Sequence, residues 1–422
     1  MLDNERSARS ADRPNILFVF MDDMGYGDMG AMGGTVIKTP NMDRVAAQGI
    51  TFRQMYAGAS VCTPSRASLL TGRYAQRVGL ERVIFPQEPE GLSAYERTIA
   101  DLLSDCGYHS AIYGKWHLGA RPEHNPLQHG FEEFFGIPYS NDMDPVHLFD
   151  GMQVAETYVD QSLLTKAYTD RAIDFISRHA DEPFFVYLPH TMPHIPLHVE
   201  EGFRGRSRGG TYGDTIECID HHLGRLLDHL DNLGLTENTL VIVTSDNGPW
   251  FEGSTGGLRG RKGESYEGGV RMPFVARWPR RIPTGTACSE PAAFIDMLPT
   301  LVRLAGGKVP DDRPIDGCDI GVPLTGGPMP DRDPIFIFHG WALNAVRDGR
   351  WKLHVRRRND RDQREMPQLF DLELDPTESY NQANREPEVL RRMLDVASRF
   401  GQHIQDQKAA AIARATAEPE VV

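Results

Sequence analysis

Two continuous apolar runs that end in polar residues are the clearest strands in the sequence. NILFVFMDD covers residues 15–23, and TLVIVTSDNG covers residues 239–248. A run that is apolar at nearly every position is typical of a parallel strand with both faces buried. Because ligands of open α/β sheets bind beyond the carboxyl ends of the strands, we expect the polar residues at these two ends to converge. They are Asp22, Asp23, Asp246 and Asn247.

Helical and strand-like segments alternate between these two runs. This alternation predicts an α/β fold, with a mainly parallel central sheet and helices on both of its faces. The predicted segments are helices at 98–107, 167–180 and 213–234, and strands at 109–116 and 184–190.

The predicted helix at 213–234 carries one apolar stripe at helical spacing, which indicates a buried face. We expect His221 and His222, beside this stripe, to face solvent rather than to bind a ligand. The stripe consists of Ile216, Ile219, Leu223, Leu226, Leu230 and Leu233.

The pattern changes after about residue 310, where Pro/Gly-rich loops precede short strand-like runs. NAVRDGRWKLHV (344–355) contains Asp-Gly between two such runs and predicts a hairpin. EVLRRMLDVASRF (388–400) predicts a helix, after which we expect an Ala/Glu-rich tail to fray. We therefore predict a catalytic α/β domain over residues 1–325 and a small C-terminal α+β subdomain, built on an antiparallel sheet, over residues 326–422.

Composition and charge narrow the possible partners. The chain of 422 residues has a net charge of −14, which disfavours nucleic acids and anionic membrane surfaces because both require a basic face. Its five cysteines form no CxxC pair, which favours a reduced compartment over a disulfide framework. No signal-peptide pattern and no bilayer-spanning segment are visible, so we expect a cytoplasmic protein without a membrane partner.

The acidic residues at the two strand ends predict a metal site. A single aspartate pair at a strand end is usually a turn or capping feature. Three carboxylates and one amide oxygen in one place form an all-oxygen site that suits Ca²⁺ or Mg²⁺ and lacks the thiolate or imidazole that zinc prefers. Because three buried negative charges would be costly without neutralisation, a divalent cation is implied.

The segment VCTPSRASLLTGR (61–73) places a cysteine at the start of a predicted helix. Thr63 can cap the helix, Pro64 suits its first position and Gly72 can end it, so we expect Cys62 just outside the helix N-terminus. One interpretation is a small buried thiol. The other is a reactive thiolate whose pKa is lowered by the helix end and by Arg66.

Three further segments supply candidate groups for an anion pocket. GKWHLG (114–119) alternates Lys, Trp and His, so an extended chain would point both polar side chains the same way. PHTMPHIPLH (189–198) is a proline-stiffened loop with candidate histidines, and the glycine-rich loop 256–273 could clamp an anion. The candidates are Lys115, His117, His190, His194, Arg259, Arg261, Lys262 and Arg271, with His190 ranked below His194.

Together these motifs resemble the sulfatase family, in the type I, formylglycine-dependent branch of the alkaline phosphatase superfamily. CTPSR (62–66) is similar to the signature at which a formylglycine-generating enzyme oxidises the cysteine. GKWHLG, PHIP, SDNG and RKGESYEGGVR occur in the family's order, and FGIPYSNDMD (135–144) is similar to its pocket segment. The resemblance spans nearly the whole chain.

The resemblance implies an arylsulfatase-like hydrolase that converts a sulfate monoester into an alcohol and inorganic sulfate. Formylglycine made from Cys62 would supply a geminal-diol nucleophile, held by Arg66 and His117, with His117 as the candidate base. Lys115, Lys262 and His194 would bind sulfate and assist the leaving oxygen. The cation, usually calcium in this family with Mg²⁺ as the alternative, would lie on Asp22, Asp23, Asp246 and Asn247. We expect a small sulfate ester or a sulfated oligosaccharide as substrate.

Two other functions fit the same residues. One is a formylglycine-dependent phosphonate or phosphate ester hydrolase, because related folds use similar metal sites. The other is an anion-binding module in which Cys62 stays a thiol. A comparison of turnover of sulfate esters with turnover of phosphate esters distinguishes the first alternative from a sulfatase. The absence of an aldehyde at position 62 would favour the second alternative.

Overall fold

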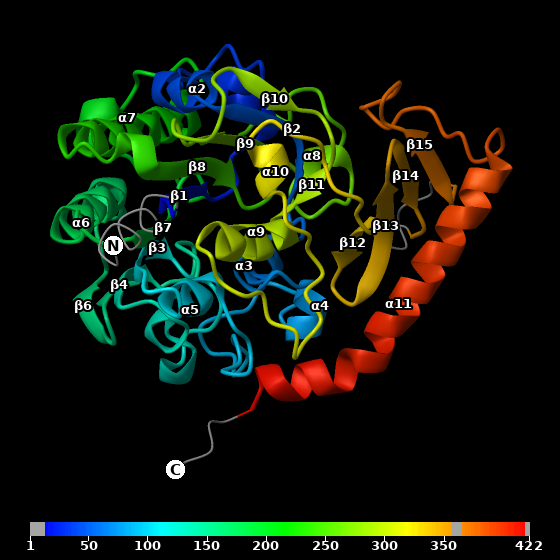
Figure 1. Ribbon diagram of the computed structural model, residues 1–422, viewed down its shortest axis with the longest axis horizontal. Coiled ribbons are helices and arrows are strands. Elements are labelled where there is room, and N and C mark those ends of the chain that lie inside the picture. Colours follow the sequence, from blue (N-terminus) through cyan, green and yellow to red (C-terminus); the bar gives the residue numbers. More distant parts are fainter. Residues whose placement is uncertain (1–12, 357–364, 418–422) are drawn as a thin grey trace, which may run out of the picture.

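The computed structural model describes residues 13–356 and 365–417, and within these ranges the strands form a sheet of eleven strands and a separate sheet of four (Figure 1). The strands of the large sheet are β1 (Asn15–Met21), β2 (Ile50–Tyr56), β3 (His109–Lys115), β4 (Glu133–Ile137), β5 (His147–Asp150), β6 (Gln153–Thr157), β7 (Phe184–Pro189), β8 (Thr239–Ser245), β9 (Arg271–Arg277), β10 (Thr286–Cys288) and β11 (Ala292–Ala293). Their order is β10-β2-β9-β8-β1-β7-β3-β4-β5-β6, and β11 pairs with β2. The central strands β8, β1, β7, β3 and β4 are parallel, whereas β9, β5 and β6 are antiparallel to their neighbours.

Helices cover both faces of this sheet. The helices of the described residues are α2 (Pro40–Ala47), α3 (Cys62–Thr71), α4 (Ala75–Val78), α5 (Ile99–Ser104), α6 (Leu164–Arg178), α7 (Gly210–Asn232), α8 (Glu267–Val270), α9 (Met297–Leu304), α10 (Gly321–Leu324) and α11 (Pro387–Ala415), of which α11 packs on the second sheet instead. Successive side chains of β1 point to opposite faces: Leu17 and Val19 pack into the core under α2, α6 and α7, and Phe18 and Phe20 into the core under α3, α5 and α9. The predicted α/β class, with a mainly parallel sheet between two helical layers, is therefore confirmed.

The long helix α7 runs from Gly210 to Asn232 rather than over the predicted 213–234, and two residues differ from their predicted burial. Its apolar stripe is buried, but the helix ends at Asn232, so Leu233 lies beyond it and is 39% exposed. His221 is exposed as expected, whereas His222 is buried and its Nε2 lies 2.5 Å from Glu200 Oε1. The expectation for His222 was wrong because its carboxylate partner comes from a loop that the helical pattern does not include.

The second sheet is antiparallel and contains β12 (Ile335–His339), β13 (Ala342–Asp348), β14 (Trp351–His354) and β15 (Gln368–Asp371). Asp348 pairs with Trp351, which confirms the hairpin predicted around Asp-Gly. This sheet lies beside the large one in Figure 1, with α11 along its outer side. The division of the chain at residues 325 and 326 stays a prediction.

The helix α11 continues well beyond its predicted end. Phe400 stacks on Phe336 of β12 with ring centroids 3.7 Å apart, and Arg77 of α4 donates to Gln407 at 2.6 Å. Ala411 and Ala415 are fully buried, so the expectation that the segment after residue 400 frays was wrong as far as residue 415. The end of the predicted tail, residues 418–422, lies outside the described residues. Among the described helices, none combines the length and apolar character that crossing a lipid bilayer requires.

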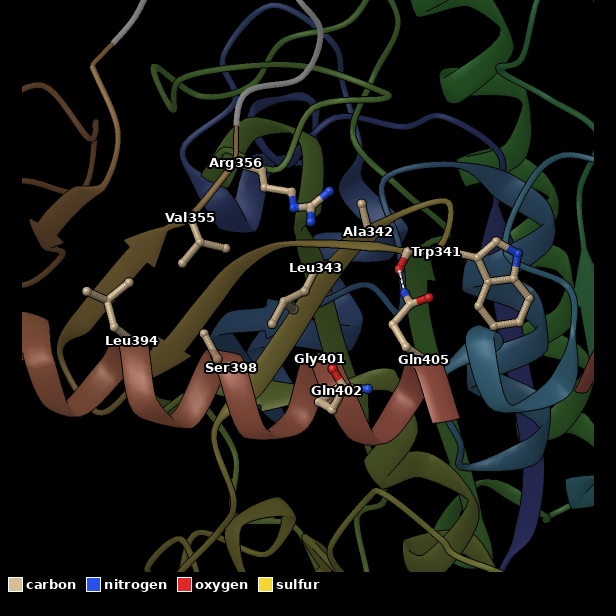
Figure 2. Close-up of a pocket in the computed structure, with 11 residues that line it drawn as sticks. Trp341, Ala342, Leu343, Val355, Arg356, Leu394, Ser398, Gly401, Gln402 and Gln405 are labelled. Atoms are coloured by element: carbon tan, nitrogen blue, oxygen red, sulfur yellow. Dashed lines mark hydrogen bonds between the residues drawn. The ribbon is translucent and has the colours of Figure 1, made fainter. Parts of the chain in front are cut away.

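A groove of about 510 Å³ lies between α11 and the second sheet (Figure 2). Leu343 and Arg356 line it from the sheet side, and Leu394 and Gln402 from the helix. Gln405 Nε2 of α11 closes one end by donating to the Trp341 carbonyl at 2.8 Å. None of the site residues predicted from the sequence, all of which lie in the described ranges, lines this groove.

Candidate active site

The carboxyl ends of β1 and β8 bring the four predicted polar residues together. The parallel register pairs Met21 with Ser245, so the residues that follow leave the sheet side by side. Asp23 N donates to Asp246 Oδ1 at 3.1 Å, and Asn247 Nδ2 donates to Asp23 Oδ1 at 2.6 Å. Asp22, like the other three, is at most 1% exposed. The convergence therefore follows from strand register in the centre of the sheet.

Helix α3 delivers Cys62 to this cluster. Cys62 is the first residue of the helix, and Val61 at the N-cap makes no side-chain cap. Thr63 Oγ1 donates instead to the His117 carbonyl at 3.0 Å, so the prediction that Thr63 caps the helix, with Cys62 outside it, was wrong. Gly72 ends the helix in the left-handed region at φ 67°, as predicted.

The Cys62 thiol is buried and points at Asp22. Its Sγ lies 3.3 Å from Asp22 Oδ1. Burial raises the pKa of the thiol well above its usual value, and the negative charge of Asp22 raises it further. The alternative of a reactive thiolate with a lowered pKa is therefore wrong for this geometry. Arg66, which that alternative required, turns to Asp246 at 2.8 Å and to the Lys115 carbonyl at 2.9 Å.

Cations surround the carboxylates on several sides. Lys115 Nζ lies 2.6 Å from Asp22 Oδ2, and Lys262 Nζ lies 2.7 Å from Asp23 Oδ2. His194 Nε2 approaches the same Asp23 oxygen at 3.7 Å. Although burial opposes ionisation, Lys115 and the other positive groups hold the pKa of Asp22 well below its usual value. The cluster thus combines ionised carboxylates with fixed cations in a dry site.

His117 offers a free ring nitrogen next to this cluster. Its backbone has φ 60°, so the chain is no longer extended there and the expected alternation with Lys115 does not apply. Its Nε2 lies 3.1 Å from the Ile84 carbonyl, which can only accept, so Nε2 carries the proton. Its Nδ1 is buried and has no hydrogen-bond partner. Burial and the nearby Lys115 lower the pKa of the ring well below its usual value, which leaves Nδ1 as an available base.

The structure separates the other candidates from the site. Arg259 donates to the Glu378 carbonyl, Arg261 to the carbonyls of Trp250 and Gly253, and Arg271 to that of Arg53. Of the four cations predicted in the glycine-rich loop, Lys262 is thus the one paired with Asp23. His190 is buried, and its ring lies 6.4 Å from that of Tyr168.

One contact at the site was missed by sequence reasoning. Ser140 Oγ accepts a hydrogen bond from Lys115 Nζ at 3.0 Å. Ser140 lies in the segment FGIPYSNDMD, just after β4. Because β4 pairs in parallel with β3, which ends at Lys115, the position of this segment was a usable signal.

Several side chains at this point could hold a metal ion. Ligand atoms of Asp22, Asp23, Cys62 and His194 all lie within 4.8 Å of one another, so a thiol and an imidazole stand beside the two carboxylates, and Asp246 is not part of this group. Asn247 Oδ1 is buried and has no hydrogen-bond partner. A bound cation would satisfy this acceptor. Burial, together with the charge of Asp22, raises the pKa of Asp246 to about 7, a sign of excess negative charge at this point. Oxygen donors of this kind suit Ca²⁺ or Mg²⁺.

Comparisons with known proteins indicate the family of the chain. The sulfatase family model matches residues 14–307. The N-acetylgalactosamine-6-sulfatase of Canis lupus familiaris is 39% identical over 380 residues, which cover 82% of this chain and 73% of that protein. Arylsulfatase A of Bos taurus is 36% identical over 459 residues, which cover 93% and 90%.

The solved structures agree as well. The crystal structure of Ps i-CgsB in complex with k-i-k-neocarrahexaose superposes with a TM-score of 0.83 at 27% identity, over 97% of this chain and 98% of that one. The family model covers more than half of the chain, and the relatives are named as sulfatases. The chain therefore belongs to the sulfatase family of sulfuric ester hydrolases.

Proposed function

We propose that this chain hydrolyses a sulfate monoester to an alcohol and inorganic sulfate, using formylglycine made from Cys62 and a divalent cation. The observation that carries the proposal is the position of the Cys62 thiol, 3.3 Å from Asp22 in a buried cluster with Lys115 and Lys262. The linear motif CTPSR supports maturation of this cysteine by a formylglycine-generating enzyme. The raised pKa of the thiol argues against the cysteine itself as nucleophile, because the thiolate is the reactive form.

The cation would be held by the side-chain oxygens of Asp22, Asp23, Asp246 and Asn247, with Ca²⁺ favoured over Mg²⁺. When bound, it would supply positive charge to the sulfate oxygens and to the group at position 62. Arg66 supports these ligands from behind, because it neutralises Asp246 and lies 3.5 Å from Asp22. This pairing holds the guanidinium against the carboxylates rather than directly against Cys62.

The other site residues have two roles: some bind the charged sulfate group, and some transfer protons. A hydrated aldehyde at position 62 would supply a geminal-diol oxygen as the nucleophile. Lys115 and Lys262 are positioned to bind the sulfate oxygens and to stabilise charge as it develops on the leaving oxygen. His194, on the same side as Lys262, would protonate that oxygen only as an imidazolium, because the proton of the neutral ring lies on Nδ1, which faces the Ile195 carbonyl at 2.6 Å. Nδ1 of His117 would accept a proton from the group at position 62.

A sulfated sugar is the substrate class that the comparisons favour. One relative is named as an N-acetylgalactosamine-6-sulfatase, and the superposed Ps i-CgsB holds a neocarrahexaose. Both names point to carbohydrate esters, so we propose a sulfated mono- or oligosaccharide as the substrate. This proposal adds the substrate class to the sulfuric ester hydrolase activity of the family.

A panel of esters tests the proposed function. Protein matured at Cys62 should turn over sugar or aryl sulfates at least about 100-fold faster than the matching phosphate monoesters or phosphonates. The measurement is product release under identical conditions, with unmatured protein as the control. Phosphonates or phosphates that outcompete every sulfate ester would replace the sulfatase proposal with the alternative hydrolase.

A further inference from the structure

A second cluster of metal-binding side chains lies at the opposite end of the central sheet from the active site. His109 is the first residue of β3, His179 follows α6, and Glu182 lies just before β7. These are the amino ends of the strands, whereas Asp22 and Asp246 follow their carboxyl ends. We propose that His109, His179 and Glu182 bind a transition-metal ion of the Zn²⁺ type.

The donor atoms already have the spacing that such an ion requires. Glu182 Oε2 lies 3.1 Å from His109 Nε2 and 3.3 Å from His179 Nδ1. All three donors lie within 4.8 Å of one another. Zinc binds nitrogen and carboxylate oxygen at about 2.0–2.2 Å, so ligands on a tetrahedral ion are about 3.3–3.5 Å apart. Because the His109 and His179 rings are stacked at 26° to each other, they must also turn apart for both in-plane nitrogens to face one ion.

A carboxylate behind His109 gives the ring the environment of a metal-bound histidine. Glu132 accepts from His109 Nδ1 at 2.9 Å, which leaves Nε2 to face the other two donors. Metal-bound histidines usually donate their second ring nitrogen to a carboxylate in this way. His179 is fixed by ring contacts, because its centroid lies 4.2 Å from that of His109 and 4.5 Å from that of Phe175.

Backbone hydrogen bonds hold the ligand-bearing segments together before any ion binds. His109 N donates to the Pro183 carbonyl at 3.0 Å, and Glu182 N donates to the His179 carbonyl at 3.1 Å. Glu132 N donates to the Ser110 carbonyl at 2.7 Å. Because the segments are already ordered, an ion gains its ligands without the entropic cost of gathering them. Glu182 remains 57% exposed at its side chain, so an ion can reach the cluster from solvent.

The rest of the fold contains a similar trio that lacks this support. Glu200, Cys218 and His222 also place ligand atoms within 4.8 Å of one another. Arg225, however, lies 3.0 Å from His222 Nδ1, and arginine can only donate. His222 Nε2 must then carry the proton toward Glu200, and no carboxylate of the described residues accepts from its other nitrogen as Glu132 does from His109. The partner of the second ring nitrogen therefore distinguishes the two groups: an arginine donates to it in His222, whereas a carboxylate accepts from it in His109.

An ion at this cluster would differ in chemistry and in effect from the one at the active site. Two imidazoles favour Zn²⁺, Ni²⁺ or Cu²⁺, whereas the active-site oxygens favour Ca²⁺ or Mg²⁺. The proposed ion would join the start of β3 to the turn between α6 and β7. Because it binds the folded chain through two segments, it should stabilise the fold without taking part in the reaction.

The test is Zn²⁺ binding by the full-length chain with Ca²⁺ in excess to saturate the oxygen site. Calorimetry should detect about one equivalent of Zn²⁺, and Zn²⁺ at about 100-fold above its Kd should raise the Tm by about 3 °C. The double variant with His109→Ala and His179→Ala should lose both effects. Glu132→Gln, which keeps all three ligands, should weaken binding about 10-fold.

The matched control is His221→Ala, which removes an exposed histidine from α7 and should leave Zn²⁺ binding unchanged. Melting curves without Zn²⁺ show whether each variant is folded. The proposal is overturned if the wild-type chain shows no Zn²⁺ binding. Equal stoichiometry and an equal Tm rise in the double variant would also overturn it, as would Glu132→Gln binding as tightly as the wild type.

Discussion

Cys62→Ser is expected to lower steady-state turnover of a sulfate ester by about 10³-fold or more while the fold is kept. Serine is nearly isosteric with cysteine, so the hydroxyl should occupy the place of the buried thiol beside Asp22. A serine oxygen can attack sulfur but has no second oxygen on the same carbon to expel the sulfate afterwards. The variant should therefore release at most about one equivalent of alcohol as a burst and then stall.

Intact-mass measurement of the stalled variant should show one retained sulfuryl group, located on the peptide that contains position 62. Cys288→Ser is the matched control, because Cys288 is a partly exposed free cysteine on β10. It should turn over like the mature protein. Sustained turnover by Cys62→Ser at the mature rate, with no retained sulfate, would show that position 62 does not release sulfate by elimination.

Removal of the metal is expected to lower turnover by about 100-fold or more, with recovery when Ca²⁺ is restored. Without the cation, Asp22 and Asp23 keep Lys115 and Lys262 in ion pairs, so these cations are less available to sulfate. The measurement is activity after exhaustive chelation, accompanied by elemental analysis. Full activity in protein that contains no metal would rule out the proposed cation.

Asn247→Ala is the most informative variant at the metal site. Asp246→Ala would leave the buried Arg66 with the 3.5 Å contact to Asp22 as its remaining ion pair, which is expected to lower stability and so obscure the effect on metal binding. Asn247 contributes an unpaired acceptor, and its loss removes a cation ligand without leaving a buried charge behind. The variant should need more Ca²⁺ for half-maximal activity than the wild type does. An unchanged Ca²⁺ requirement would remove Asn247 from the ligand set.

The sequence predicted those parts of the site that depend on local pattern and parallel topology. The runs before Asp22 and Asp246 are apolar at nearly every position, and parallel strands place both ends at one edge of the sheet. Lys115 follows from the same rule, since β3 is a central strand that ends at this edge. Lys262 was selected by resemblance to a motif, because its loop has four cations and no periodic pattern.

Other features depend on contacts that no local pattern contains. His222 is buried with Glu200 as its partner, and the pKa of the Cys62 thiol is raised by burial and by Asp22, which the fold places against it. Thr63 matched a capping pattern but donates to the His117 carbonyl, which comes from another segment. α11 continues to Ala415 because it packs on α4, where its small residues are buried. In each case a tertiary partner overrides the local preference.

The central claim is that position 62 acts as formylglycine, and one paired measurement tests it most directly. The chain is produced with and without a formylglycine-generating enzyme, and the peptide around Cys62 is probed with a hydrazide reagent while turnover of a sulfate ester is recorded. We predict that hydrazide labelling and turnover rise together, and that protein with a plain thiol is at least about 100-fold slower. Equal turnover in both preparations, with labelling in only one, would contradict the account.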